Sequence, residues 1–177
     1  LAPKRLKLSL WQRAAISVIF GIVDETGKRQ FREVFWVVGR KQGKTLLAAA
    51  IASYMAYAAG EYGSEIYFLA PKLEQADLAY SALEFNVHAE PELDAITRST
   101  KYRGLVIGET NTIIRKLAFT SKKSDGYNPM FYCADEVAAW PGVNGLRQWE
   151  VMASGTGARR EPLGLAISSG GYENEGL

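Results

Sequence analysis

Runs of consecutive apolar residues recur along the chain, separated by longer segments in which apolar residues follow helical spacing. The second half of residues 31–38, most of residues 64–70 and residues 130–134 are apolar at successive positions. This pattern is typical of strands buried on both faces of a parallel sheet. A further strand is expected over residues 163–167. Strands of this kind that alternate with helices predict an α/β fold with a mostly parallel central sheet covered on both faces.

Amphipathic or Ala-rich segments between the apolar runs predict four helices. They span residues 8–20, with Ser9 as N-cap, 44–59, which ends before Gly60, 73–88 and 146–153. Two short strands, residues 105–107 and 112–119, flank a polar turn and predict a hairpin inserted into the α/β pattern. Polar and glycine-rich composition predicts loops over residues 121–129 and 154–160.

A glycine-rich segment lies between the first predicted strand and the Ala-rich helix: Gly39-Arg40-Lys41-Gln42-Gly43-Lys44-Thr45. In such a context backbone N–H groups and the positive helix end converge on the phosphates of a nucleotide triphosphate. Lys44 would neutralise phosphate charge and Thr45 would hold Mg²⁺. Only three residues separate the two glycines, where the usual pattern has four and would need glycine at Val38, so the loop is a variant. The alternative is an ordinary strand-to-helix turn with a solvated lysine.

Two further polar groups follow predicted strands. Asp135-Glu136 come directly after residues 130–134, and Ser168-Ser169-Gly170 come after residues 163–167. The carboxyl ends of parallel strands share one edge, where ligands of such sheets bind. Asp135 would hold Mg²⁺ opposite Thr45, and Glu136 would act as general base on the attacking water. The alternative is a strand that ends in acids facing solvent.

Three other residues extend the candidate site. Arg40 lies inside the phosphate loop, where a guanidinium can contact the γ-phosphate and strengthen that contact in the transition state; pairing with an acid such as Glu136 is the alternative. Trp11-Gln12 in the first helix would place Gln12 on the adenine edge with an aromatic ring beside it. A packing role for this Trp-Gln pair stays open.

The composition of the chain limits the classes of function that it can have. The 177 residues (19.5 kDa) suit about one domain, and a net charge of +2 gives no general affinity for nucleic acid. Contact with DNA would need local clusters, namely Arg29/Arg32, Lys101/Arg103 or Lys122/Lys123. One cysteine, Cys133, and one histidine, His88, exclude a disulfide framework and a Cys/His zinc site within the chain. Cys133 is expected in the core and His88 on the surface.

Two expectations concern the place of the chain in the cell and in its parent protein. No apolar run reaches the roughly 20 residues that a membrane-spanning helix needs, so we expect a cytoplasmic protein. The sequence begins without methionine and stops just after a predicted strand, so we expect a single domain, residues 1–177, excised from a longer protein.

Taken together, these motifs resemble the N-terminal ATPase domain of a phage terminase large subunit, a DNA-packaging motor. Residues 10–12 resemble its adenine motif, 39–45 its arginine-bearing variant Walker A motif and 131–136 its Walker B motif. Residues 124–129 resemble the Asp-Gly-x-Asn-Pro segment before Walker B, and 168–170 the coupling motif. The resemblance implies a P-loop NTPase of RecA/ASCE-like type, a three-layer sandwich with an additional strand between the Walker A and Walker B strands.

The resemblance also implies partners and a mode of action. We expect ATP and Mg²⁺ as cofactors, and a homo-oligomeric ring around double-stranded DNA, with the portal and the small terminase subunit, in the host cytoplasm at the procapsid portal. The family's nuclease domain is not expected in this chain. A trans-acting arginine finger is expected, for which Lys123, Arg159 and Arg160 are candidates, with a solvated surface role as the alternative. Rival hypotheses are a nucleotide-dependent assembly switch with little turnover and a helicase-like ATPase.

Overall fold

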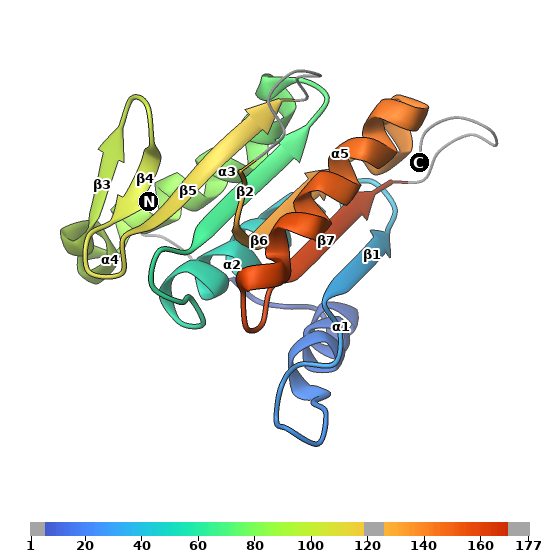
Figure 1. Ribbon diagram of the computed structural model, residues 1–177, viewed down its shortest axis with the longest axis horizontal. Helices are drawn as coiled ribbons and strands as arrows, with labels where there is room; N and C mark the ends of the chain where they lie inside the picture. Colours follow the sequence, from blue (N-terminus) through green and yellow to red (C-terminus); the bar gives the residue numbers. More distant parts are fainter. Residues whose placement is uncertain (1–5, 119–125, 170–177) are drawn as a thin grey trace.

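A seven-stranded sheet runs through the protein in the order β1-β7-β6-β2-β5-β4-β3 (Figure 1). The structure, a computed structural model, describes residues 6–118 and 126–169. Five strands, from β1 to β5 in this order, are mutually parallel, while β4 and β3 continue the sheet in antiparallel fashion. The strands are β1 (Glu33–Val37), β2 (Glu65–Ala70), β3 (Thr97–Thr100), β4 (Gly104–Ile107), β5 (Thr112–Ala118), β6 (Pro129–Asp135) and β7 (Leu163–Ser168).

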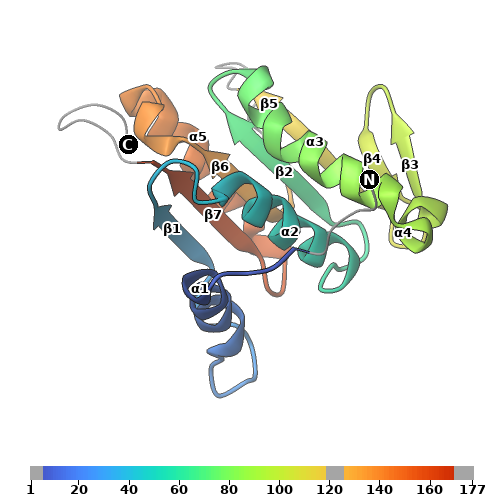
Figure 2. The same cartoon turned by 180° about the vertical axis from the view of Figure 1, so that it is seen from behind.

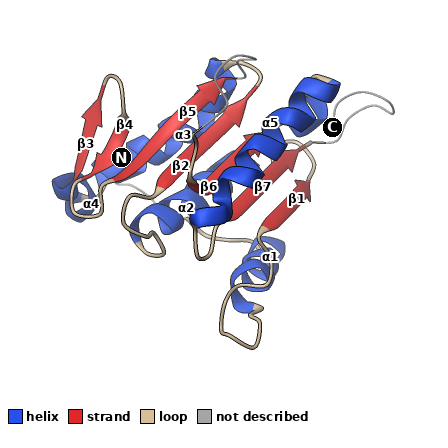
Figure 3. Ribbon diagram, in the orientation of Figure 1, coloured by secondary structure: helices blue, strands red, loops and turns tan. Residues whose placement is uncertain are grey.

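Helices cover both faces of this sheet. The helices α2 and α3 lie on one face, with α1 beside α2, and α5 lies on the other (Figures 1 and 2). Their bounds are α1 (Leu10–Gly21), α2 (Lys44–Tyr57), α3 (Leu73–Ala89), α4 (Pro91–Ile96) and α5 (Gly142–Gly155), with single 3₁₀ turns over Val137–Ala139 and Thr156–Ala158. The expected three-layer α/β sandwich is confirmed (Figure 3). Among the described residues no helix is both long and apolar enough to cross a membrane.

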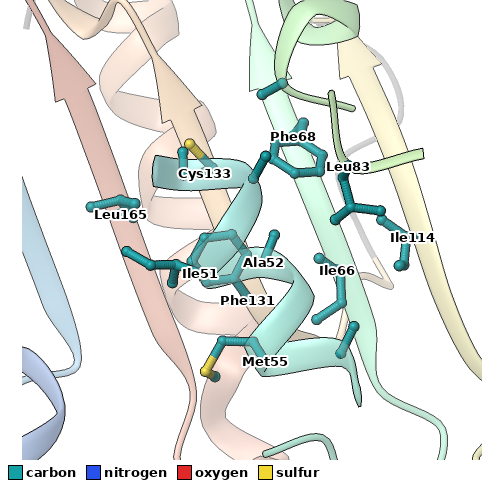
Figure 4. Packing of buried hydrophobic residues seen from close by; sticks show 14 of the residues in the cluster. Ile51, Ala52, Met55, Ile66, Phe68, Leu83, Ile114, Phe131, Cys133 and Leu165 are labelled. Atoms are coloured by element: carbon teal, nitrogen blue, oxygen red, sulfur yellow. The ribbon is translucent and has the colours of Figure 1, made fainter. Parts of the chain in front are cut away.

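The two faces of the sheet have separate cores. On the α2 and α3 side, Ile51 and Met55 of α2 pack over Phe131 and Leu165, and Leu83 of α3 packs near Ile114 (Figure 4). Small buried alanines on α2 allow this helix to lie close to the strands. On the α5 side the core is aromatic, built from Tyr67, Tyr132, Trp140 and Trp149 with smaller neighbours. Cys133 is buried in the first core, as predicted.

The strand order carries the family feature that the sequence motifs implied. β7 lies between β1, which leads into the glycine-rich loop, and β6, which ends in Asp135. An additional strand therefore separates the two motif-bearing strands, as expected. The predicted hairpin of β4 and β5 is also confirmed.

Three predictions about local structure were wrong. β1 is the edge strand rather than one buried on both faces, and Phe35 and Val37 are 60% and 71% exposed. The last helix is longer than expected, so much of the glycine-rich segment 154–160 is the end of α5 and a 3₁₀ turn. Arg29, expected in a surface cluster, is buried, and its guanidinium donates to the carbonyls of Glu161 and Pro162.

Candidate nucleotide-binding site

The glycine-rich loop joins the end of β1 to the start of α2. Gly43 is the N-cap of α2 and has φ 77°, a left-handed conformation that glycine adopts without strain. Lys41 also has a positive φ, 62°, so the loop turns sharply twice before the helix. Residues 39–43 are exposed, whereas Lys44 is buried and Thr45 half-buried in the first turn of α2. The first turn of a helix leaves N–H groups without intrahelical acceptors, which suits the binding of an anion.

The ammonium group of Lys44 lies between the loop and the end of β6. It donates a 3.0 Å hydrogen bond to the Val38 carbonyl and lies 3.7 Å from Oε1 of Glu136. The structure thus brings the loop lysine and the predicted general base together, although they are 92 positions apart in the sequence. This contact argues against a merely solvated lysine at position 44.

Asp135 and Glu136 differ in environment although they are adjacent. Asp135 is 8% exposed, and its burial, together with the neighbouring charge of Glu136, raises its pKa to about 6. Partial burial also opposes ionisation of Glu136, but hydrogen bonds from Ser169 and the charges of Lys44 and Arg40 outweigh it and lower its pKa. Two neighbouring acids whose pKa values are shifted in opposite directions suit two different roles, that of an ion ligand and that of a base.

The backbone of Glu136 is in the left-handed region, with φ 49° and ψ 50°. A non-glycine residue in this region stores a small amount of strain, which is tolerated where surrounding contacts fix it. Here the indole N–H of Trp140 donates to the Asp135 carbonyl at 2.8 Å, and a 3₁₀ turn begins at Val137. The chain therefore turns sharply away from β6 and leaves the Glu136 carboxylate beside β7.

Ser168 and Ser169 connect the loop with the acids. The Val38 N–H donates to the Ser168 carbonyl at 3.0 Å, and the Ser168 hydroxyl accepts from the Ala138 N–H at 3.3 Å. The Ser169 hydroxyl lies 2.9 Å from both carboxylate oxygens of Glu136, and its N–H donates to Oε2 at 3.2 Å. Gly170, the third residue of this predicted motif, lies outside the described residues.

Gln12 and Trp11 occupy different positions relative to the loop. The Gln12 amide Nε2 donates to the Gln42 carbonyl at 3.4 Å, and its Oε1 accepts from the Ser9 N–H at 2.9 Å. Gln12 is therefore next to the loop, and its contact with the adenine edge stays a prediction. Trp11 packs edge to face on Trp36 of β1, with ring centroids 6.2 Å apart, which is a packing role.

Arg40 is exposed at the tip of the loop. No ion pair of Arg40 with Glu136 is present among the described residues, yet Arg40 is near enough for its charge to lower the pKa of that carboxylate. The alternative of an ion pair between Arg40 and Glu136 is therefore not seen within these residues.

The candidates for a trans-acting cation lie elsewhere. Arg159 is not the mobile basic group expected: its side chain is 7% exposed and donates to the carbonyls of Asn128, Tyr62 and Gly63. Arg160 is exposed, while its N–H donates to Glu61 at 2.8 Å. Lys123 lies outside the described residues.

The sequence analysis missed one member of the site, Val38. It takes part only through its backbone, accepting from Lys44 and donating to Ser168. A side-chain pattern carries no signal for such a role. Its place directly before the glycine-rich loop was the one available clue.

Within residues 6–118 and 126–169, no cluster of three or more His, Cys, Asp or Glu side chains is arranged to hold a metal ion. One buried carboxylate and one helix-terminal hydroxyl, Asp135 and Thr45, instead match the donor set of Mg²⁺, which keeps several waters and binds through few protein oxygens.

Comparisons with known proteins identify the family and the fold of the chain. The profile of the family described as "Terminase large subunit, ATPase domain" matches residues 10–177. None of the curated proteins compared matches the chain significantly by sequence. The solved large terminase of bacteriophage HK97 has a TM-score of 0.81 at 22% identity, and the match covers 97% of this chain and 35% of that one.

Two further structures have the same fold. The ATPase domain of the Thermus phage P74-26 large terminase matches with a TM-score of 0.59 at 18% identity, covering 93% of this chain and 70% of that one. A large terminase from a thermophilic bacteriophage, solved in complex with ADP, matches with a TM-score of 0.60 at 11% identity, covering 91% and 38%. The chain spans about a third of the HK97 protein. Since the family profile covers nearly the whole sequence, the chain belongs to the family of terminase large-subunit ATPase domains.

Proposed function

We propose that this chain is a Mg²⁺-dependent ATPase that drives double-stranded DNA into a viral capsid. The observation that carries the proposal is the meeting of three motifs at the carboxyl ends of β1, β6 and β7. There Lys44 lies 3.7 Å from Glu136, and Ser169 contacts the same carboxylate. This is the edge of a parallel sheet at which nucleotides bind.

Each residue then has a role in phosphoryl transfer, a reaction that depends on positioning and electrostatics. The loop 39–43 and the first turn of α2 would hold the phosphates, with Lys44 and Arg40 neutralising charge on them. Thr45 and Asp135 would hold Mg²⁺, which neutralises charge that develops on the phosphate oxygens. Glu136 would orient the attacking water and accept its proton, and Gln12 would contact the adenine edge.

The state of Asp135 is compatible with this role. With a pKa of about 6, its carboxyl group is mostly ionised at pH 7 and is available as a hard oxygen ligand. Its position at the end of β6 is fixed, since the indole N–H of Trp140 donates to the backbone carbonyl of Asp135 itself. Ser168 and Ser169 would report the state of the nucleotide, because they contact both the loop backbone and the Glu136 side.

The proposal extends to assembly. We infer that the active form is a homo-oligomeric ring at the procapsid portal, acting with the small terminase subunit in the host cytoplasm. Arg160, whose residue is exposed and whose backbone N–H donates to Glu61, is a candidate for the cation that one subunit supplies to its neighbour. The chain would supply the ATPase part of its parent protein, and we expect no cleavage of DNA by these residues.

Phosphate release tests the proposal, measured for the wild type and for Glu136→Gln over a range of protein concentrations. Loss of the base should lower turnover about 10²- to 10⁴-fold while a fluorescent ATP analogue still binds. Glu150→Gln on the exposed surface of α5 is the matched control and should keep full activity. Equal inactivity of the wild type and Glu136→Gln at every concentration, with nucleotide bound to both, would replace the motor with a nucleotide-dependent switch.

A further inference from the structure

The antiparallel end of the sheet carries a local excess of positive charge. Residues 97–118, which form β3, β4 and β5, contain five basic residues and one acid, a formal charge of +4. The whole chain has a charge of +2, so the remaining residues together are negative. The basic residues are Arg98, Lys101, Arg103, Arg115 and Lys116.

The turn between β3 and β4 is the outermost part of this charged region. Lys101, Tyr102 and Arg103 are all exposed, Tyr102 by 84%, and the Lys101 ammonium lies 5.8 Å from the Tyr102 ring centroid. Among the described residues, no acid forms an ion pair with Lys101 or Arg103. Two free cations flanking an exposed aromatic ring are thus presented on a single short turn.

Hydrogen bonds between side chains and the backbone hold this turn in one shape. The Arg103 N–H donates to the Thr100 hydroxyl at 3.0 Å, and that hydroxyl donates to the Gly104 carbonyl at 3.1 Å. From the neighbouring strand, the Arg115 guanidinium donates to the carbonyls of Tyr102 and Arg103, both at 3.3 Å. A turn held in this way loses little conformational freedom when it binds a partner.

Beside the turn is an open groove of about 430 Å³. Lys101, Tyr102 and Arg115 line it together with Tyr80 of α3. It also contains Glu84 and Lys116, but Lys116 is already paired with Asp77. Since Arg115 is bonded to the carbonyls of the turn, the basic groups that remain for a partner on this surface are those of Lys101 and Arg103.

The turn lies at the same edge of the sheet as the nucleotide-binding site. Thr100 pairs with Gly104 and Leu105 pairs with Ile114, so the turn projects toward the carboxyl end of β5. β5 is parallel to β2, and β2 is parallel to β6, at whose carboxyl end Asp135 lies. In Figure 1 the turn and the arrowheads of the parallel strands point to the same side.

We propose that the β3–β4 turn, residues 101–103, binds the sugar-phosphate backbone of double-stranded DNA. This inference rests on the proposed function, since it assigns the DNA contact of the same motor domain. Lys101 and Arg103 supply phosphate contacts that do not depend on base sequence, and the Tyr102 hydroxyl adds a neutral donor. The net charge of the whole chain did not predict this affinity, because the negative charge of the other residues offsets the positive charge of residues 97–118.

The test is fluorescence anisotropy with a mixed-sequence duplex of DNA over a series of salt concentrations. The double variant Lys101→Ala/Arg103→Ala should bind at least 10-fold more weakly at low salt. Its slope of log K against log [salt] should fall by about 2, since each lost phosphate contact removes about 0.9. Lys7→Ala/Arg147→Ala removes the same charge from exposed positions elsewhere and should bind like the wild type.

Three results would overturn the inference. The first is that the double variant and its control bind the duplex equally well. The second is that the wild type does not bind the duplex at low salt. The third is that the double variant loses self-association in sedimentation while it still binds DNA. The last result would assign the turn to a second copy of the chain. Binding of a fluorescent ATP analogue, measured on the same samples, distinguishes the two proposals. If the wild type does not bind the analogue, only the proposed nucleotide site is refuted, whether or not the duplex binds.

Discussion

Ser169 holds the carboxylate of Glu136 at both oxygens. Its hydroxyl lies 2.9 Å from each oxygen, and its N–H donates to Oε2 at 3.2 Å. The residue that directly follows β7 thereby fixes the side chain that follows β6, next to the ammonium group of Lys44. The position of the proposed base consequently depends on a serine, which makes Ser169 a positioning residue for hydrolysis.

Replacing Ser169 by alanine should lower turnover about 10-fold with a smaller change in KM for ATP. The variant loses the two hydroxyl contacts and leaves Glu136 less well oriented toward water. Because these hydrogen bonds help to lower the pKa of Glu136, their loss raises it, and the acid limb of the kcat profile moves to higher pH. The pH dependence of phosphate release measures this shift.

The control for that prediction is Ser169→Thr, which keeps the hydroxyl. It should restore the acid limb to its wild-type position. An alanine variant with reduced turnover but an unmoved pH profile would mean that Ser169 acts through folding alone.

Asp135 should make folding stability depend on pH. Burial raises its pKa to about 6, above the unfolded value, so between roughly pH 4 and 6 the native state binds more protons than the unfolded chain. The free energy of unfolding therefore falls as the pH rises through this window. The destabilisation caused by ionising the buried Asp135 carboxyl is complete above pH 6. Asp135→Asn removes the cost and should stabilise the protein at pH 7 by about 1–3 kcal/mol.

Urea unfolding between pH 4 and pH 8, without nucleotide or metal, measures that difference. The gain of Asp135→Asn over the wild type should shrink toward zero near pH 4. Glu150→Gln, on an exposed part of α5, is the control and should show no such trend. A gain that stays constant over the range would refute the link to titration of Asp135.

The sequence allowed the alternation of strands and helices to be predicted, and with it the edge on which the site lies. It did not show that β1 is an edge strand, because residues 34–38 are as apolar as a central strand and their place depends on pairing with β7 alone. Thr97–Thr100 and Pro91–Ile96 were missed for a different reason. They lack an apolar period, and β3 forms because β4 supplies its hydrogen bonds.

For the candidate site, too, the motifs could be predicted from local sequence, whereas the contacts between them could not. The loop, the acids and the serines could each be found from a strand that ends in polar residues. Contacts between them, such as Lys44 with Glu136 or Gln12 with the Gln42 carbonyl, depend on how distant segments pair in the sheet. The burial of Arg159 was equally unpredictable, because the carbonyls that it binds come from two separate loops.

Arg159→Ala should destabilise the protein by about 1–3 kcal/mol, since it leaves the part-buried carbonyl oxygens of Asn128 and Gly63, and the exposed one of Tyr62, without their charged donor. Turnover per folded molecule should stay within about twofold of the wild type. Thermal unfolding and phosphate release on the same preparations measure both effects. Exposed Arg160→Ala is the control for stability and should shift it by less than about 0.5 kcal/mol.

An Arg159 variant that keeps its melting temperature but loses turnover about 10³-fold would instead identify Arg159 as the finger supplied to a neighbouring subunit. That result would contradict the structural role inferred from its burial.

Gly104→Ala should cost more stability than an ordinary glycine replacement in the left-handed region. Gly104 has φ +71°, and a Cβ there would lie 2.2 Å from the Ile114 carbonyl oxygen, a backbone atom of the neighbouring strand. Gly27 has a similar φ, +78°, but a Cβ there would meet nothing within 4 Å. Gly27→Ala should therefore cost only the conformational penalty of about 1–2 kcal/mol.

Because Gly104→Ala adds a clash to the same penalty, we expect a loss of about 3 kcal/mol or more, with β4 displaced from β5. Urea unfolding of the two variants gives the comparison directly, and the common conformational penalty cancels in their difference. Equal losses would mean that β4 moves away from β5 at little cost. The turn at residues 101–103 would then lack the firm base on which its proposed contact with DNA depends.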